Sequence, residues 1–486
     1  MFDWKKYLNK PDLIQTGLLI DGIWINNRET FTVINPANNE LLANISIATD
    51  EDLNNAVKSS NNAFTVWSRK TSLERSRLIH KLYELIIKNL DDLALILTIE
   101  QGKPLTESRN EILYSASFFE WFSEEAKRTY GDIVPASKSN QRITVIKQAI
   151  GVCAAITPWN FPSAMLGRKL APALAAGCVL IAKPASQTPL SANALGVIAL
   201  EAGIPVGCFN LIHGHSGKIG EFLCHNQDIR KLTFTGSTEV GVWLYQNSAN
   251  TMKKLSLELG GNAPLIVFDD ADLDVAVDGI MSSKFRNSGQ TCVCSNRILV
   301  HKNIKDNLIN RLLERINKLK LGNGCDESVS LGPLINDDAI MHANSLVNDA
   351  IDKGAQIICG GKVAKNIGDK FFEPTIVDCL DTNNRLFKEE IFAPVLPIYT
   401  FTTDEEAIAM ANDTEYGLAS YIFTQSNARI YRVSEDLEFG MVGVNTGIIS
   451  AENVPFGGIK MSGLGREGGK TGINEYLVEK YICTQI

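Results

Sequence analysis

Three short apolar runs, separated by helical segments, constrain the fold of this chain more than any other feature. They are GCVLIAKP at 177–184, CFNLIHG at 208–214 and RKLTFTG at 230–236. Apolar strands that alternate with helices are typical of βαβ units, which build a parallel sheet with helices on its faces. Such sheets bind nucleotides beyond the C-terminal ends of their strands, so we expect any nucleotide site at that edge.

A second α/β stretch begins after about residue 255. Its strand-like runs are PLIVFDD at 264–270, RILVH at 297–301 and QIICGG at 356–361, again with helical segments between them. We predict a separate domain with its own sheet. A length of 486 residues leaves room for two or three domains, at about 150 residues for each.

The first region of the chain mixes short strands with helices. LLIDGIWIN at 18–26 predicts a strand, a turn and a second strand. The segment Thr71–Glu74 is a capping-box pattern, and the apolar spacing after it predicts an amphipathic helix through Asn89. A second helix is expected at about 91–101, closed by Gly102.

Two segments far apart in the chain alternate polar and apolar residues as edge strands do. They are RITVIK at 142–147 and EYLVEKYICTQI at 475–486. Two edge strands of this kind suggest an arm used between subunits. The alternative, that they pair only within one chain, stays open.

Composition narrows the possible function classes. The formal net charge of -8, the pI near 5.5 and the lack of a Lys/Arg run argue against nucleic acid or an anionic membrane as partner. No apolar stretch approaches the ~18 residues of a membrane span. The first residues, MFDWKKYLNKPDL, have no apolar core behind their lysines, so we expect no secretory signal. Ten cysteines and six histidines without metal-ligand spacing predict a cytoplasmic protein with neither a disulfide scaffold nor a metal site.

The segment SGQTCVCSNR at 288–297 contains the first candidate catalytic residue. Cys292 is flanked by Gly, Gln and Thr, between a helix-like segment and a strand, which suits a nucleophile. The thiolate is the reactive form, and nearby backbone N–H groups or positive charge favour it. Because a lone loop cysteine is more often inert, this pattern alone leaves both interpretations open. No catalytic His motif stands beside Cys292, so a papain-like site has no support.

Two further motifs contain groups that can assist a nucleophile. Glu258 in LELGGN (257–262) ends a β-type run before two glycines, where a carboxylate can act as general base. Asn160 in TPWNFP (157–162) offers an amide N–H that can stabilise an oxyanion. Taken alone, each is more often an ordinary surface or turn residue.

Together these motifs resemble those of the aldehyde dehydrogenase superfamily. The motifs PWNFP, KPAS (183–186), FTGSTEVG (234–241), LELGGN, GQTC and EEIFAP (389–394) occur in the family's order and at its approximate spacing. The resemblance covers nearly the whole chain. The runs EQGKPL, RKLAPALAAG, SKFRNSGQTCVC and FGGIKMSGLGREG are most similar to the succinate-semialdehyde dehydrogenase branch.

The resemblance implies an α/β fold with a Rossmann-type cofactor domain and an α/β catalytic domain. The cofactor domain is expected at 1–122 and 148–257 and the catalytic domain at 258–462. A small β oligomerisation arm is expected at 123–147 and 463–486. Family members are commonly homodimers or homotetramers, so a homo-oligomer is expected here.

The resemblance also implies a mechanism without a metal. Cys292 attacks the aldehyde carbonyl, while the Asn160 side-chain amide and the Cys292 backbone N–H hold the developing oxyanion. After hydride passes to the nicotinamide, Glu258 activates water to hydrolyse the thioester. Because both Cys292 and Glu258 are present, the sequence argues against a catalytically silent member. Glu258 also argues against an acylating enzyme that passes the thioester to coenzyme A.

Several cofactor residues follow from the same resemblance. FTGSTEVG lacks the GxGxxG spacing of a dinucleotide fingerprint, but the family pattern puts Gly236 and Ser237 near the pyrophosphate. Trp159 is expected to line the cofactor channel. Glu390 is expected to hydrogen-bond the nicotinamide ribose, with Phe392 packing beside it.

Lys183 and Ser186 are expected at the adenine ribose. An acidic residue there would repel a 2′-phosphate, whereas Ser186 is neutral and Lys183 adds positive charge. NADP is therefore expected to be accepted and preferred over NAD. The alternative, that Lys183 donates only to ribose hydroxyls and Ser186 caps a turn, stays open.

Two arginines suggest the substrate class. If the family fold holds, Arg168 and Arg286 approach the substrate channel and suit a carboxylate at the far end of a short aldehyde. Ser450 in NTGIIS resembles the family's third contact to that carboxylate. Succinate semialdehyde, an intermediate of 4-aminobutyrate degradation, is the expected substrate. Glutarate semialdehyde is one alternative, because one methylene is worth only ~1–3 kcal/mol of discrimination. Another aldehyde of the superfamily, such as a betaine or aliphatic aldehyde, is the other, but aromatic or acidic residues in place of the two arginines would have favoured it. Either arginine alone is more often part of a structural ion pair.

A redox hypothesis concerns Cys292 and Cys294, which are two residues apart. A flexible loop can bring such Cα atoms within the ~4.4–6.8 Å that a disulfide needs. Oxidation would then consume the nucleophile. A packed Cys294 with no such role is the equal alternative.

Overall fold

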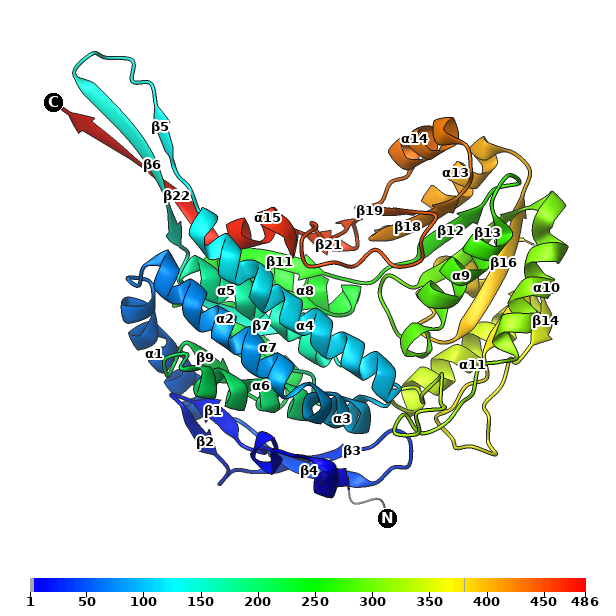
Figure 1. Ribbon diagram of the computed structural model, residues 1–486, viewed down its shortest axis with the longest axis horizontal. Helices are drawn as coiled ribbons and strands as arrows, with labels where there is room; N and C mark the ends of the chain where they lie inside the picture. Colours follow the sequence, from blue (N-terminus) through cyan, green and yellow to red (C-terminus); the bar gives the residue numbers. More distant parts are fainter. Residues whose placement is uncertain (1–3, 380) are drawn as a thin grey trace.

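The computed structural model describes residues 4–379 and 381–486. Two sheets, each packed against helices, form two lobes, and a thin β arm extends away from the first lobe (Figure 1). Within the described ranges, no helix is long and apolar enough to cross a membrane. The α/β fold class expected from the sequence is confirmed.

The first sheet contains the three apolar runs of the middle of the chain. Its strands are β1 (Leu18–Ile20), β2 (Ile23–Ile25), β7 (Val152–Ile156), β8 (Val179–Lys183), β9 (Phe209–Leu211), β10 (Ile229–Thr235), β11 (Lys254–Glu258) and β21 (Gly463–Leu464). They lie in the order β2-β1-β9-β8-β7-β10-β11-β21. The five strands from β9 to β11 are parallel, and β1, β2 and β21 are antiparallel additions at the edges. The predicted parallel sheet is therefore confirmed.

Eight helices of this lobe surround the sheet. They are α1 (Asp50–Trp67), α2 (Ser72–Lys88), α3 (Leu90–Gln101), α4 (Leu105–Glu125), α5 (Pro162–Ala176), α6 (Pro189–Ala202), α7 (Ser216–His225) and α8 (Thr238–Ser248). The predicted capping box forms, because the Thr71 side chain accepts from Glu74 N while the Glu74 side chain accepts from Thr71 N. α3 ends as expected at Gly102, whose φ of 99° is left-handed.

The second sheet confirms the second predicted α/β unit. Its strands are β12 (Ala263–Val267), β13 (Ser295–His301), β14 (Gln356–Cys359), β15 (Thr375–Asp378), β16 (Val395–Phe401), β18 (Ala419–Phe423) and β19 (Met441–Val444). They lie in the order β14-β15-β16-β13-β12-β18-β19. Only β14 is antiparallel to its neighbour.

Helices cover both faces of the second sheet, which explains why β12 is apolar throughout. Leu265 and Val267 belong to a core cluster with side chains of α9 (Leu273–Lys284) and α10 (Lys305–Ile316). Ile266, which points to the opposite face, packs in a cluster with α11 (Asp337–Asp352), α13 (Asp404–Asn412) and α14 (Asn427–Asp436).

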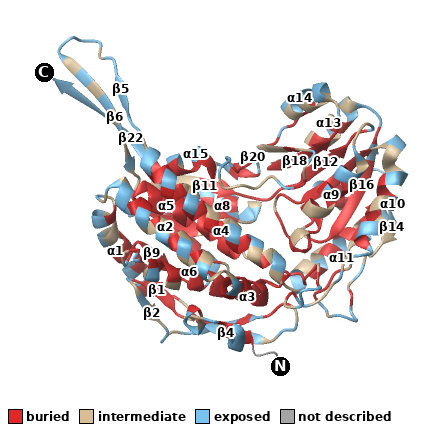
Figure 2. Cartoon of the chain, in the orientation of Figure 1, coloured by how far each residue is buried: buried red, intermediate tan, exposed pale blue. Residues whose placement is uncertain are grey.

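The arm consists of β5 (Asp132–Val134), β6 (Gln141–Ala149) and β22 (Leu477–Gln485), in the order β22-β6-β5. β22 pairs antiparallel with β6, from Leu477 opposite Ala149 to Gln485 opposite Gln141. Both segments that were predicted to be edge strands do form strands. They pair with each other within one chain, which was the alternative to pairing between subunits. Their outer residues stay exposed (Figure 2), so use between subunits remains a prediction.

The remaining elements are short. They are β3 (Thr30–Ile34), β4 (Leu41–Ser46), α12 (Arg385–Lys388), β17 (Tyr416–Gly417), β20 (Ile459–Lys460) and α15 (Gly469–Gly472). Between β21 and β22 the chain still contacts the first sheet, where Ser256 Oγ donates to Glu475 Oε2 at 3.0 Å. The arm strand therefore begins only at Leu477, and the expected domain boundaries remain predictions.

Candidate active site

The C-terminal ends of four neighbouring parallel strands bring the sequence motifs together. In register, Ile156 of β7 lies beside Lys183 of β8 and Phe234 of β10, and Thr235 of β10 lies beside Glu258 of β11. TPWNFP, KPAS, FTGS and LELGG all occur at these strand ends. Because the strands are parallel, one edge of the sheet carries all four segments, as expected for such a fold.

A cavity of about 270 Å³ opens at this edge and receives residues from both lobes. Most of the expected site residues line it: Trp159, Asn160, Arg168, Gly236, Ser237, Arg286, Cys292, Glu390, Phe392 and Ser450. Glu258, Lys183 and Ser186 do not line it. Other lining residues were not singled out from the sequence, because an apolar or aromatic side chain alone does not signal a site: Tyr114, Phe161, Met165, Val293 and Phe456. Phe161, Val293 and Phe456 nevertheless lie within the quoted motifs.

Cys292 lies in the turn before β13 as a half-buried free thiol. Burial raises the pKa of Cys292 to about 12, and the nearby Glu390 carboxylate also raises it. Arg168 and Arg286 act in the opposite direction but do not offset these effects. In the protein without ligands, these surroundings therefore favour the thiol over the thiolate. A nucleophilic Cys292 needs a base to remove its proton.

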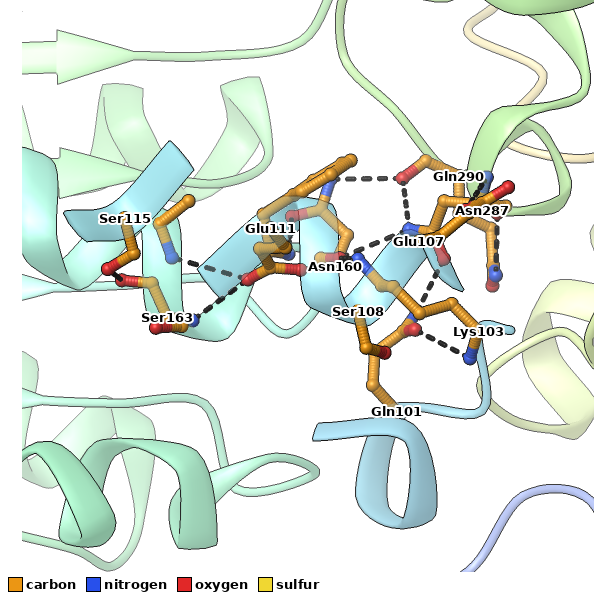
Figure 3. Close-up of polar contacts among 12 residues, drawn as sticks. Gln101, Lys103, Glu107, Ser108, Glu111, Ser115, Asn160, Ser163, Asn287 and Gln290 are labelled. Atoms are coloured by element: carbon orange, nitrogen blue, oxygen red, sulfur yellow. Dashed lines mark hydrogen bonds and ion pairs between the residues drawn. The ribbon is translucent and has the colours of Figure 1, made fainter. Parts of the chain in front are cut away.

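Asn160 is anchored to the loop of the nucleophile (Figure 3). Its Nδ2 donates to the Gln290 carbonyl at 3.1 Å, and its Oδ1 accepts from Phe161 N at 3.1 Å. An amide nitrogen carries two hydrogens, so one remains for a ligand in the cavity. This arrangement suits an oxyanion donor beside Cys292.

Glu258 is a buried carboxyl group without partners. Its side chain is 2% exposed, and neither oxygen has a hydrogen-bond partner within the described part of the chain. Burial raises the pKa of Glu258 well above its usual range, and Glu467 adds to the rise, although Arg168 and Lys169 oppose it. A carboxyl group with a raised pKa suits a general base that must work near neutral pH.

Arg168 already has a partner in the structure. Its Nε lies 2.6 Å from Glu467 Oε2, and its Cζ lies 4.1 Å from the centre of the Phe456 ring. Lys169 pairs with the other oxygen of Glu467 and donates to Thr235 Oγ1 at 2.7 Å. Arg168 therefore lines the cavity as one member of a buried ion-pair cluster. Nothing in the sequence around Glu467 signalled this cluster.

Arg286 differs from Arg168. It forms no ion pair or side-chain hydrogen bond with the described residues, whereas Arg168 is paired with Glu467, and the Arg286 Cζ lies 5.4 Å from the centre of the Phe161 ring. The buried hydroxyl of Tyr114, another lining residue, lies beside Arg168, which opposes the rise that burial causes in the pKa of Tyr114. Of the two arginines in the cavity, Arg286 is thus the one that the described residues leave unpaired.

Five of the expected cofactor residues line the cavity: Trp159, Gly236, Ser237, Glu390 and Phe392. Ser237 is the N-cap of α8, so the predicted helix opening at FTGS is confirmed. Glu390 Oε1 accepts from Gly261 N at 3.0 Å, and burial raises the pKa of Glu390 to about 7. The Trp159 and Phe392 rings meet edge to face, with their centroids 5.7 Å apart.

These groups fit a dinucleotide. The free N–H groups of a helix N-terminus suit a phosphate, a carboxylate suits a ribose hydroxyl, and aromatic edges suit a flat ring. Phe392 has a φ of 50°, a left-handed conformation that is strained for a bulky residue. Such strain is characteristic of functional sites.

Lys183 and Ser186 lie at the same sheet edge, outside the cavity lining. Lys183 is 3% exposed, and its Nζ donates to the Pro184 carbonyl at 3.2 Å. Burial lowers the pKa of Lys183 to about 8, so it is mostly protonated at neutral pH. Ser186 is half-buried in the turn that follows β8.

Cys294, two residues after Cys292, is a buried free cysteine. Cys294 is 5% exposed, with its Sγ 3.7 Å from the carbonyl oxygens of Lys284 and Ser295. Cys292 and Cys294 are both free thiols, as in the packed alternative. Across residues 4–379 and 381–486, no group of three or more His, Cys, Asp or Glu could hold a metal ion.

Comparisons with known proteins agree with this geometry. A model of the aldehyde dehydrogenase family matches residues 24–482. The mitochondrial succinate-semialdehyde dehydrogenase of Oryza sativa subsp. japonica is 52% identical over 473 residues, which are 97% of this chain and 90% of that protein. The NADP+ succinate-semialdehyde dehydrogenase of Escherichia coli K12 is 50% identical, over 98% of this chain and 99% of that protein. The glutarate-semialdehyde dehydrogenase of Pseudomonas aeruginosa is also 50% identical, with the same coverage.

Solved structures share the whole fold. A crystal structure of an NADP-dependent Escherichia coli enzyme has a TM-score of 0.97 at 49% identity, covering 99% of this chain and 100% of that chain. The betaine aldehyde dehydrogenase of Staphylococcus aureus, solved in complex with NAD+, has a TM-score of 0.96 at 35% identity, covering 99% and 97%. The family model, the relatives and the shared fold establish what the motifs predicted: the chain belongs to the aldehyde dehydrogenase family.

Proposed function

We propose that this chain oxidises succinate semialdehyde to succinate with NADP or NAD. One observation carries the substrate: an arginine with an unpartnered Nε, Arg286, lines the same cavity as Cys292. A short aldehyde with a carboxylate at its far end can meet both groups at once. Relatives named for succinate semialdehyde support this choice.

Cys292 and Asn160, which line the cavity, and the buried Glu258 support a covalent route. Glu258 takes the thiol proton of Cys292, whose Sγ then attacks the aldehyde carbon. Asn160 Nδ2–H and the Cys292 backbone N–H receive the oxyanion, and loss of one such donor costs roughly 10²–10³ in rate. A nicotinamide held beside Trp159 and Phe392 would supply the acceptor for the hydride that leaves as the oxyanion collapses to the thioester carbonyl. Glu258 releases the thiol proton to solvent and then takes a proton from water, whose oxygen attacks the thioester carbon. The C–S bond breaks, and the Cys292 thiolate that leaves recovers a proton from Glu258.

Arg168 and Ser450 are further candidates for contacts to the substrate carboxylate. Both line the cavity, but the ion pair of Arg168 with Glu467 limits what it can offer. Trp159, Gly236, Ser237, Glu390 and Phe392 are proposed to hold the cofactor, with Lys183 and Ser186 near its adenine ribose. We propose NADP as the preferred cofactor, because no carboxylate stands at Ser186 and the Escherichia coli relative is named for NADP+.

Glutarate semialdehyde is the second candidate substrate, supported by a relative named for it. The experiment is a comparison of kcat/KM for succinate semialdehyde, glutarate semialdehyde and butanal, each with NADP and with NAD. We expect succinate semialdehyde with NADP to give the highest value and butanal the lowest. Equal values for butanal and both semialdehydes would remove the substrate assignment but leave the family unchanged.

We also propose a cytoplasmic homodimer or homotetramer. The exposed β arm offers strand edges to a second copy, and the free cysteines suit a reducing compartment. Analytical ultracentrifugation of the purified chain and of a variant that lacks β22 tests the oligomer. Cell fractionation tests the location.

A further inference from the structure

A buried polar network joins the start of α4, the start of α5 and the loop of the nucleophile (Figure 3). Lys103 Nζ lies 2.6 Å from Glu111 Oε2, and both side chains are completely buried. The same Nζ donates to the Asn160 carbonyl at 2.7 Å. A buried ammonium group is thus bound both to its counter-ion and to the backbone of the expected oxyanion donor.

Glu111 fixes the helix that follows Asn160. Its Oε1 accepts from Ser163 N at 3.0 Å and from Ala164 N at 3.2 Å. These N–H groups belong to the first turn of α5, where no intrahelical acceptor exists. One carboxylate therefore holds both Lys103 and the helix start directly after Asn160.

Asn287 connects the network to the nucleophile loop. Its Nδ2 donates to the carbonyl oxygens of Asn160 and Gln290, each at 3.1 Å. Its backbone N donates to Glu107 Oε2 at 2.7 Å, and its Oδ1 accepts from Gln101 Nε2 at 3.0 Å. The φ of Asn287 is 51°, so these bonds hold a left-handed turn five residues before Cys292.

We propose that Lys103, Glu111 and Asn287 are positioning residues that aim the Asn160 amide at the oxyanion. None of the three lines the cavity, so any effect on chemistry must pass through Asn160 or its loop. Lys103 and Asn287 hold the Asn160 backbone carbonyl, while Asn287 and the Asn160 side chain share the Gln290 carbonyl. The distance between Asn160 and the Cys292 loop is thereby set by hydrogen bonds on both sides.

The buried ion pair between Lys103 and Glu111 is better explained by the positioning of Asn160 than by stabilisation of the fold. A buried ion pair is often no more stabilising than well-packed apolar residues of similar volume. Apolar residues could fill the space of Lys103 and Glu111, but they could not bind the Asn160 carbonyl or the N–H groups of α5. Directional bonds that hold a reacting group are what a catalytic site needs from its surroundings.

The inference rests on the proposed role of Asn160, so the test is a double-mutant cycle with Asn160→Ala. The measurement is the rate of hydride transfer in a single turnover with succinate semialdehyde and saturating NADP. Lys103→Met should slow this step about 10- to 100-fold, because displacements near 1 Å have costs of that size. The Kd of NADP and the KM of the aldehyde should change less than about twofold, because no binding contact is lost. In the Asn160→Ala background, Lys103→Met should have almost no further effect.

Two companion variants guard against misfolding. Glu111→Gln keeps an acceptor oxygen for α5, and Asn287→Gly removes the amide donors without adding strain at positive φ. Both should slow hydride transfer and lose that effect in the Asn160→Ala background. Arg28→Met is the matched control: it breaks the ion pair with the buried Asp52 far from the cavity and should leave the rate unchanged.

The outcomes separate the two proposals. Wild-type hydride transfer in Asn160→Ala would overturn both the oxyanion role of Asn160 and its positioning. If Asn160→Ala is slow, but the network variants slow it further by the same factor as in wild type, only the positioning inference fails. A rise in KM without a fall in the transfer rate would overturn the inference as well.

Discussion

Two buried polar regions lie beside the nucleophile loop, and they differ in how their groups are satisfied. Behind Asn160, the side chains of Lys103, Glu111 and Asn287 each make two or more hydrogen bonds. Around Cys292, both oxygens of Glu258 and the Nε of Arg286 have no partner in the described part of the chain. Because buried polar groups are nearly always bonded, unpartnered ones need an explanation. We infer that the hydrogen-bonded residues behind Asn160 hold the local structure in place. The unpartnered groups around Cys292 are free to interact with ligands.

Two carboxyl groups that are buried to a similar extent, Glu258 and Glu467, illustrate the difference between partnered and unpartnered groups. Glu258 is 2% exposed and Glu467 is 6% exposed. Burial alone would raise the pKa of Glu467, but Lys169 and Arg168 hold it below its usual range. The same two cations also act on Glu258, but it has no hydrogen bond or ion pair with the described residues, and burial raises its pKa. Partners, more than depth, decide which of the two can exchange a proton.

The largest effect should come from the unbonded region. Cys292→Ala removes the proposed nucleophile, so we expect steady-state turnover to fall by at least about 10³-fold. NADP should still bind, because the cofactor groups are untouched. Reduced cofactor is measured in steady state, and NADP binding by fluorescence titration. Substantial turnover by Cys292→Ala would contradict the covalent route.

Glu258→Gln should have the next largest effect, of about 10²–10⁴-fold on thioester hydrolysis. Hydride transfer should slow less, so a burst of reduced cofactor should precede a slow steady state. Rapid-mixing kinetics of reduced NADP would reveal it. Equal slowing of both steps would contradict the role of Glu258 in hydrolysis, because loss of the base for the thiol alone would slow the formation of the adduct and every step after it.

The raised pKa of Glu258 also predicts a pH dependence. Only the ionised carboxylate can accept a proton, and its pKa lies above the ~4.3 of free glutamate. The wild-type kcat should therefore fall as the pH drops through this raised pKa, at values where an ordinary glutamate is still ionised. The pH profile of Glu258→Gln should lack that limb. A wild-type limb at the ordinary glutamate pKa would contradict the unpartnered state of Glu258.

Local sequence patterns predicted much of the fold, and some of the residues in the two polar regions. The alternation of apolar runs with helices was enough for both sheets, and Thr71–Glu74 for one helix start, because these signals lie within a few residues. Cys292, Asn160 and Glu258 were found through short motifs that resemble a known family. Their surroundings could not be found in that way. Lys169 and Glu467 are 298 residues apart, and no local pattern states which carboxylate a buried cation will meet.

The same limit explains the two arginines. Both were expected to bind the substrate carboxylate, and both line the cavity. Only the three-dimensional contacts show that Arg168 is paired with Glu467 while the Arg286 Nε is unpartnered. Asn287 lies within the quoted run SKFRNSGQTCVC, but its role depends on bonds to Gln101, Glu107 and Asn160 that the run does not contain.

Arg286→Ala should reduce kcat/KM for succinate semialdehyde by roughly 10- to 100-fold, because a hydrogen bond to a charged group is worth ~1.5–3 kcal/mol. The loss should appear mainly in KM, since the carboxylate is distant from the reacting carbon. Butanal, which has no carboxylate, should be nearly unaffected. Steady-state kinetics with both aldehydes give the result, and equal losses for both would make Arg286 structural.

Arg168→Ala is the contrast: it leaves Glu467 with one cation fewer and should lower the midpoint of urea unfolding as well.

The smallest effect should come from Ser186, which lies outside both polar regions. Two like charges about 4 Å apart cost ~1 kcal/mol in water and more where solvent is partly excluded. Ser186 is half-buried. Ser186→Glu should therefore weaken NADP relative to NAD by roughly 5- to 10-fold, through repulsion of the 2′-phosphate. The rate of hydride transfer with NAD should not change, because Ser186 does not line the cavity that Asn160 and Cys292 line. Ser186→Gln, which has nearly the same shape without the charge, is the control. If Glu and Gln shift the NADP to NAD ratio of kcat/KM equally, then shape and not charge governs this turn, and Ser186 does not explain a preference for NADP.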